Sequence, residues 1–146
     1  MTQADFYILG EQTLEARDHF TCRLIDKAVR HGRNVFVHVD DKQHAQHFDE
    51  LLWVFRPESF IPHEVQHPDS KIDGCPVHIG WTTPINEQHD IIINTSHRLP
   101  EFFGRFSRLM EVVVQEDAIL KYTREHYRFL HNRGYAIQHQ DMRVVA

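Results

Sequence analysis

Short apolar segments alternate with amphipathic helical segments along this chain of 146 residues, and this alternation constrains its fold most. Valine, isoleucine and aromatic residues concentrate in five segments, residues 5–9, 34–40, 76–81, 90–94 and 108–114. Three consecutive isoleucines at 91–93 are typical of a strand that is buried on both faces, as in a parallel sheet. The alternation therefore predicts an α/β fold, a three-layer sandwich around a largely parallel sheet.

Between these segments, apolar residues recur every three or four positions, as they do in helices with one buried face. The pattern predicts helices from Leu14 to Val29, from a cap at Asp40 or Asp41 to a stop at Pro57, and from about Glu116 to Arg133. It also predicts a short helix after Pro100, an edge strand over residues 136–142 and a polar loop over residues 63–74.

Size and composition predict one domain over residues 1–146, with a hydrophobic fraction of 41% that is ordinary for a globular protein. The formal net charge of −5 argues against a protein that coats duplex DNA by itself, because that role needs a clustered basic surface. The start of the chain lacks the basic and apolar regions of a secretory signal. We therefore expect a cytoplasmic protein in which Cys22 and Cys75 stay reduced.

No motif in the sequence predicts a cofactor or a metal ion. The first predicted strand-to-helix turn has a single glycine, Gly10, beside Glu11, and a phosphate cradle needs several closely spaced glycines without a repelling carboxylate. The 13 histidines include the pair His44 and His47, but they are spread along the chain and no cysteine pair accompanies them. We expect neither a bound nucleotide nor a metal site.

Asp40 and Asp41 leave one enzymatic alternative open. Together with nearby histidines they could form the metal-binding carboxylates of a small phosphoesterase. Aspartate is also a common helix cap, and we favour that interpretation because a helical pattern begins directly after the pair.

Residues 51–63 combine large apolar side chains with two prolines that prevent a continuous helix or a central strand. Its aromatic residues include Trp53 and Phe60, and such side chains offer a wide contact area at small rotamer cost. The segment either contacts a partner or folds onto the core of the chain itself.

The last predicted helix carries Lys121, Arg124 and Arg128 on one face, with Tyr127 at its border. Guanidinium groups bind carboxylates, and the ring, with apolar surface such as Val113, suits an apolar side chain. The patch suits an acidic ligand with a hydrophobic anchor, but the residues by themselves favour a solvated charged face. A direct single-stranded DNA binder is a further alternative, although its aromatic candidates point to different faces of the helix: Tyr122, Tyr127 and Phe129.

Several motifs resemble the chi subunit family of bacterial DNA polymerase III. They are Asp5-Phe6-Tyr7, Asp49-Glu50-x-Leu52-Trp53, residues 56–63 (RPESFIPH) and Arg124-Glu125-x-Tyr127. The resemblance extends from Asp5 to about Ile137, and RPESFIPH is its most specific part. It implies a Rossmann-like domain without a nucleotide-binding loop and a noncatalytic accessory role in DNA replication.

The resemblance also implies partners and the residues that bind them. A chi-like subunit joins the clamp loader through the psi subunit and binds the acidic C-terminal tail of single-strand-binding protein. By position, Trp53 and Phe60 would bind psi, on a surface that a helicase could share. The tail site would contain Val113, Lys121, Arg124, Tyr127 and Arg128. The chain departs from the family at Leu120, where the family has a lysine, and Lys121 is the cation that would substitute for it.

Overall fold

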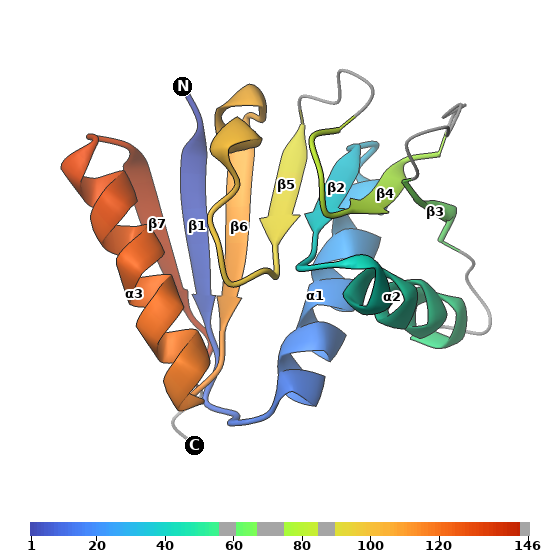
Figure 1. The fold of residues 1–146 in the computed structure, drawn as a ribbon, viewed down its shortest axis with the longest axis horizontal. Helices are drawn as coiled ribbons and strands as arrows, with labels where there is room; N and C mark the ends of the chain where they lie inside the picture. Colours follow the sequence, from blue (N-terminus) through green and yellow to red (C-terminus); the bar gives the residue numbers. More distant parts are fainter. Residues whose placement is uncertain (56–60, 67–74, 85–89, 144–146) are drawn as a thin grey trace.

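The computed structural model describes residues 1–55, 61–66, 75–84 and 90–143. Within these ranges the strands are β1 (Gln3–Ile8), β2 (Val35–His38), β3 (His63–Val65), β4 (Val77–Gly80), β5 (Ile91–Asn94), β6 (Arg108–Val113) and β7 (Ala136–Asp141). The helices are α1 (Leu14–Arg30), α2 (Lys42–Phe55), α3 (Asp117–Asn132) and the 3-10 helix η1 (Glu101–Arg105). All strands join one parallel sheet in the order β3-β4-β2-β5-β6-β1-β7 (Figure 1).

Local sequence signals explain where the helices begin and end. The Thr13 side chain accepts the backbone N–H of Ala16 at the start of α1, and Glu116 caps α3 in the same way. Gly32 and Gly134 follow the last residues of α1 and α3 with φ angles of 73° and 80°, in the left-handed region that glycine adopts without strain.

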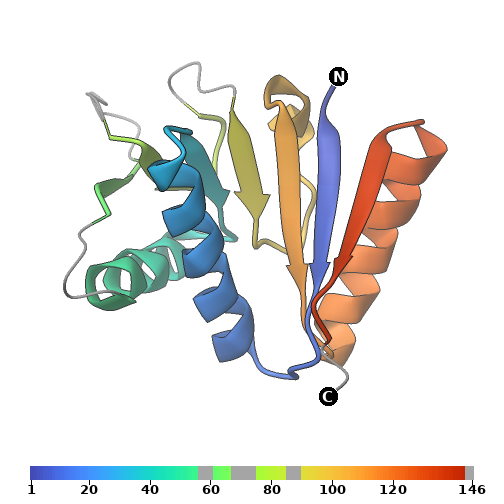
Figure 2. The same ribbon diagram turned by 180° about the vertical axis from the view of Figure 1, so that it is seen from behind.

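The sandwich has its two helical layers on opposite faces of the sheet (Figures 1 and 2). Side chains alternate along each strand, so Val35 and Val37 of β2 pack toward α1 and α2, while Phe36 packs toward η1 and α3. Ile91 and Ile93 of β5 likewise join the first apolar cluster, and Ile92 joins the second. This arrangement confirms the predicted α/β sandwich and the burial of the isoleucine strand on both faces.

The predicted loop over residues 63–74 is wrong at its beginning, because His63–Val65 forms β3. This strand has three half-buried residues, among them His63 and Glu64, and pairs with β4. Such a short strand at an edge has no apolar periodicity, and its conformation depends on β4. Residues 67–74 lie outside the described ranges.

The described helices include none that is long and apolar enough to cross a membrane.

Candidate protein-interaction sites

The structure brings the three predicted cations of α3 together on one exposed surface. Lys121, Arg124 and Arg128, the basic face, line a surface pocket of about 400 Å³. Its other lining residues are Asp117, Leu120 and Glu125. The pocket thus offers three cations against two carboxylates, which favours an anionic ligand.

The predicted apolar residues of this site lie beneath and beside the pocket instead of lining it. Val113 is only 7% exposed, so it belongs to the packed layer under α3. Tyr127 is half-buried, with its ring 6.0 Å from that of Phe6 and 5.3 Å from that of His139. Leu120 both lines the pocket and packs against the cluster that contains Val113. The aliphatic contact of the pocket is therefore Leu120.

A buried ion pair fixes the inner side of α3 to the sheet. The Nδ1 atom of His126 lies 2.8 Å from Oε2 of Glu111 on β6, and both side chains are almost fully buried. Asn94 of β5 donates its Nδ2–H to the same carboxylate at 3.0 Å. The Nε2 atom of His126 lies 3.1 Å from the carbonyl oxygen of His97. Because both ring nitrogens face acceptors, the geometry favours a ring that donates from both nitrogens, the imidazolium.

The electrostatics of His126 agree with this geometry. Burial by itself would lower the pKa of His126, but the hydrogen bond and the charge of Glu111 outweigh it and leave the pKa above its usual value. The contact between His126 and Glu111 thus fixes the orientation of α3 on the sheet. It thereby positions the basic face, which lies on the opposite side of the helix.

Sequence reasoning missed this pair, although one signal was visible. Glu111 stands in the apolar strand segment 108–114, in phase with Leu109 and Val113, which face the core. A carboxylate at such a position needs a partner, but the sequence does not say which of the 13 histidines supplies it.

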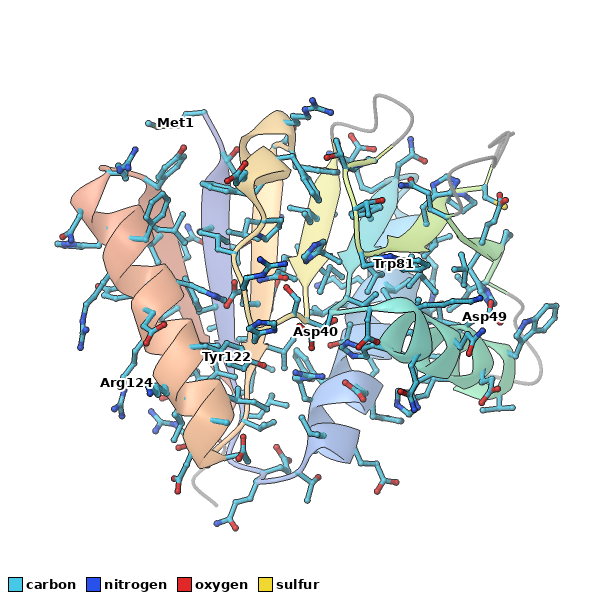
Figure 3. All side chains as sticks on the ribbon, viewed as in Figure 1. Met1, Asp40, Asp49, Trp81, Tyr122 and Arg124 are labelled. Carbon is cyan, nitrogen blue, oxygen red and sulfur yellow. The ribbon has the colours of Figure 1, made fainter. Side chains whose placement is uncertain are left out.

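Tyr122 is held on the side of α3 away from Arg124 (Figure 3). Its hydroxyl accepts a hydrogen bond from Nη1 of Arg17 at 3.0 Å, and Arg17 is buried beside Asp18. Phe129 is 41% exposed and lies under the guanidinium of Arg133. The rings of α3 therefore form no continuous stacking surface, which disfavours direct binding of single-stranded DNA.

The second predicted site lies at the C-terminal end of α2, at the other edge of the sheet (Figure 1). Trp53 is 57% exposed and Val54 is 72% exposed, and together they form the α2 end. The Trp53 ring meets the ring of His63 edge to face at 5.3 Å. Exposed apolar side chains in neighbouring positions are typical of a protein contact. Phe60 lies outside the described residues.

Asp40 and Asp41 have structural partners. The Asp41 carboxylate accepts the backbone N–H of His44 at 2.9 Å, which supports the capping interpretation. Asp40 accepts the backbone N–H of His97 at 2.9 Å and contacts its ring Nδ1 at 2.6 Å. Burial would raise the pKa of Asp40, but these hydrogen bonds from His97 outweigh it and lower the pKa.

The described ranges also show what a reactive cysteine, a metal site and a nucleotide-binding loop would require. Burial, with the nearby charge of Asp18, raises the pKa of Cys22 to about 12, so its thiol stays protonated at neutral pH. No group of three or more metal-ligating side chains occurs among the described residues. The turn after β1 uses the Glu11 carbonyl to accept the backbone N–H of Gln115 at 2.8 Å, and it forms no nucleotide-binding loop.

Comparisons with known proteins agree on one family. Residues 1–138 match the family described as "DNA polymerase III chi subunit, HolC". A DNA polymerase III subunit chi from Pseudomonas aeruginosa is 38% identical over 138 residues, which cover 94% of this chain and 95% of the relative. Proteins of the same name from Escherichia coli and Haemophilus influenzae are 29% and 27% identical over 140 residues each. The three relatives are named as polymerase subunits.

Proposed function

The chain belongs to the DNA polymerase III chi subunit family, and on that premise we propose that it is a noncatalytic accessory subunit that connects two partners during DNA replication. One partner is the psi subunit of the clamp loader, and the other is the acidic C-terminal tail of single-strand-binding protein. In this proposal the whole chain, residues 1–146, acts as one cytoplasmic domain, and its contact with DNA is indirect.

The observation that carries the proposal is the separation of two unlike surfaces. The α2 end is apolar and packs at the β3–β4 side of the sheet, while the basic face belongs to α3 at the β7 side (Figure 1). Two partners could therefore bind at the same time, which a connecting subunit requires.

The basic face suits the tail because its pocket offers both kinds of contact that an acidic peptide with an apolar residue needs. Arg124 and Arg128 can bind carboxylates, and Leu120 and Tyr127 supply apolar surface next to them. Lys121 adds a third charge at the same pocket, in place of the family lysine at the Leu120 position.

The α2 end suits psi, or a helicase that competes for the same surface, because a large exposed aromatic residue is a typical anchor of a protein interface. Trp53 provides that anchor, and Phe60 is proposed to extend it.

A binding experiment with both partners tests the proposal. The full chain is mixed with purified psi and with a fluorescent peptide of the single-strand-binding protein tail, and complexes are separated by size. We expect one complex that contains all three components. Trp53→Ala should remove psi and leave the tail peptide bound, and the double variant Arg124→Ala, Arg128→Ala should do the reverse. The assignment would be refuted if either variant lost both partners, or if both variants still bound psi and the tail peptide.

A further inference from the structure

The sheet has one region that α1 leaves uncovered. α1 packs over β2, β5 and β6, and no helix in the described part of the chain lies over β1 and β7 on this side (Figure 2). Parallel sheets usually have both faces covered, because their crossover connections place helices there. Half-buried Tyr7 of β1 and exposed Gln140 of β7 border this open region.

A groove lies between α1 and the uncovered strands. It consists of two pockets of about 720 and 350 Å³ that share lining residues. The shared residues are Tyr7, Leu24, Lys27, His31 and Met142. We call the two pockets together the α1 groove, and its size is that of a ligand site.

The floor of the α1 groove is mainly aliphatic. Leu24 and Ala28 of α1 face Ile91 and Met110 of the sheet across it. Met142 closes one side with a side chain that is 43% exposed, and methionine adapts its shape to different apolar partners.

The rim of the α1 groove is cationic, although the whole chain carries a formal net charge of −5. The cations are Arg23, Lys27, Arg30, Arg33 and Arg108. Two of them already pair with carboxylates, Arg30 with Asp26 and Arg108 with Asp5.

Three rim cations form no ion pair with a carboxylate of the described residues: Arg23, Lys27 and Arg33, all of them exposed. Arg23 lies over the Phe20 ring, and Lys27 and Arg33 remain for a ligand. Asp90, the remaining carboxylate of the larger pocket, accepts the backbone N–H of Asn34 at 2.7 Å. A partner that brings its own carboxylates to this rim would therefore find unpaired cations.

The α1 groove fits a peptide better than a nucleic acid. A single strand binds through aromatic faces on which its bases stack. Two aromatic rings line the groove, those of Tyr7 and Phe20. Both are half-buried and pack 5.6 Å from each other, and Arg23 lies over the Phe20 ring, so their faces are partly covered. The other apolar lining side chains are aliphatic.

We propose that the α1 groove binds an acidic amphipathic helix of a protein partner, which covers β1 and β7 as the missing part of this layer. Its apolar side lies on Met142 and the aliphatic floor, and its carboxylates lie beside Lys27 and Arg33. This interface is distinct from the basic face of α3 and from the α2 end.

A titration of the isotope-labelled full chain with a synthetic peptide tests the proposal by NMR. The probe is a helical peptide with leucine on one side and glutamate on the other, and the same peptide with lysine in place of glutamate is the control. We expect saturable shifts at Tyr7, Leu24 and Met142 with the acidic peptide only. The double variant Lys27→Glu, Arg33→Glu should weaken binding about tenfold or more, and Met142→Glu should weaken it without removing a cation.

Matched variants separate this site from the other two. The double variant Lys42→Glu, Arg133→Glu changes the net charge as much as Lys27→Glu, Arg33→Glu does, but at exposed positions outside the α1 groove. It should bind the acidic peptide like the wild type. Arg124→Ala should also bind normally, so failure of the proposed tail site would leave this test unaffected. Absence of groove shifts with the acidic peptide, equal binding of the lysine peptide, or groove shifts with oligo-dT in its place would overturn the proposal.

Discussion

The α2 end and the basic face of α3 lie at opposite edges of one sheet, and they differ in how the fold supports them. Trp53 and Val54 lie exposed on the last turn of α2, where the Trp53 ring contacts the ring of His63. The basic face lies on a helix whose inner side is held by the buried pair of Glu111 and His126. An apolar anchor needs only exposure, whereas a set of charges that must match a ligand needs a helix in a fixed position.

The largest effect should come from breaking the support of α3. Glu111→Ala removes one partner of a buried ion pair and leaves His126 without its acceptor, so it should lower the free energy of unfolding by about 3–5 kcal/mol. Urea unfolding measures the loss. Glu101→Ala, on exposed surface of η1, is the matched control and should change stability by about 0.5 kcal/mol or less. Equal losses in the two variants would contradict the role of the pair.

A smaller and purely local effect is expected at the α2 end. Trp53→Ala should weaken binding of psi by about 2–4 kcal/mol, as expected for an aromatic anchor, and Phe60→Ala should act in the same direction. Stability should change little, because the Trp53 side chain is 57% exposed. Calorimetric titration with psi measures the affinity, and Leu14→Ala, at a similarly exposed apolar residue of α1 (53%), serves as the control. A large loss of stability with normal psi affinity would assign Trp53 to the core.

At the basic face, Arg124→Ala should weaken binding of the tail peptide by about 2 kcal/mol, because it leaves a partly desolvated carboxylate without a partner. Arg128→Ala should have a smaller effect if it lies at the rim of the contact. Fluorescence anisotropy measures both variants.

Salt sharpens the contrast between the two surfaces. Tail affinity should fall between about 50 and 300 mM salt, since exposed charges are screened over roughly 10 Å or less. Psi binding at the α2 end should change less. The reverse order of salt dependence would contradict the assignment of the two surfaces.

Stability should depend on pH in opposite directions through two histidines. The raised pKa of His126 means that its contribution is complete below about pH 6.5 and is lost as the pH rises through the folded value. Burial lowers the pKa of His38 despite its hydrogen bond to Asn94, so its contribution is present above about pH 6.5 and is lost on acidification. Urea unfolding across this range should show that His126→Asn removes the alkaline loss and that His38→Asn reduces the acid loss, to which His44 also contributes because burial lowers its pKa.

For added nucleotides we expect no effect on stability. Neither ATP nor NAD at millimolar concentration should raise the melting temperature, because the turn after β1 has one glycine, Gly10, and carries Glu11 where a phosphate would lie. A saturable rise of several degrees in thermal unfolding would overturn the noncatalytic proposal.

Much of the architecture follows from the sequence because its signals are local. Apolar runs such as Ile91–Ile93 and the glycines after α1 and α3 act over a few neighbouring residues, and they predict the strands and the helix ends. The grouping of Lys121, Arg124 and Arg128 also follows directly, since helical spacing alone puts them on one face.

Tertiary structure decided what depends on contacts between distant segments. The order of the strands places β6 and β5 between β1 and β2, and no periodicity contains that information. The pairing of Glu111 with His126, the edge strand β3 and the burial of Val113 all depend on which elements become neighbours. The α1 groove has the same origin, because α1 and β7 border the same uncovered face of the sheet. These two elements are more than a hundred residues apart in the sequence. Local free-energy preferences fix the elements, and packing fixes the surfaces between them.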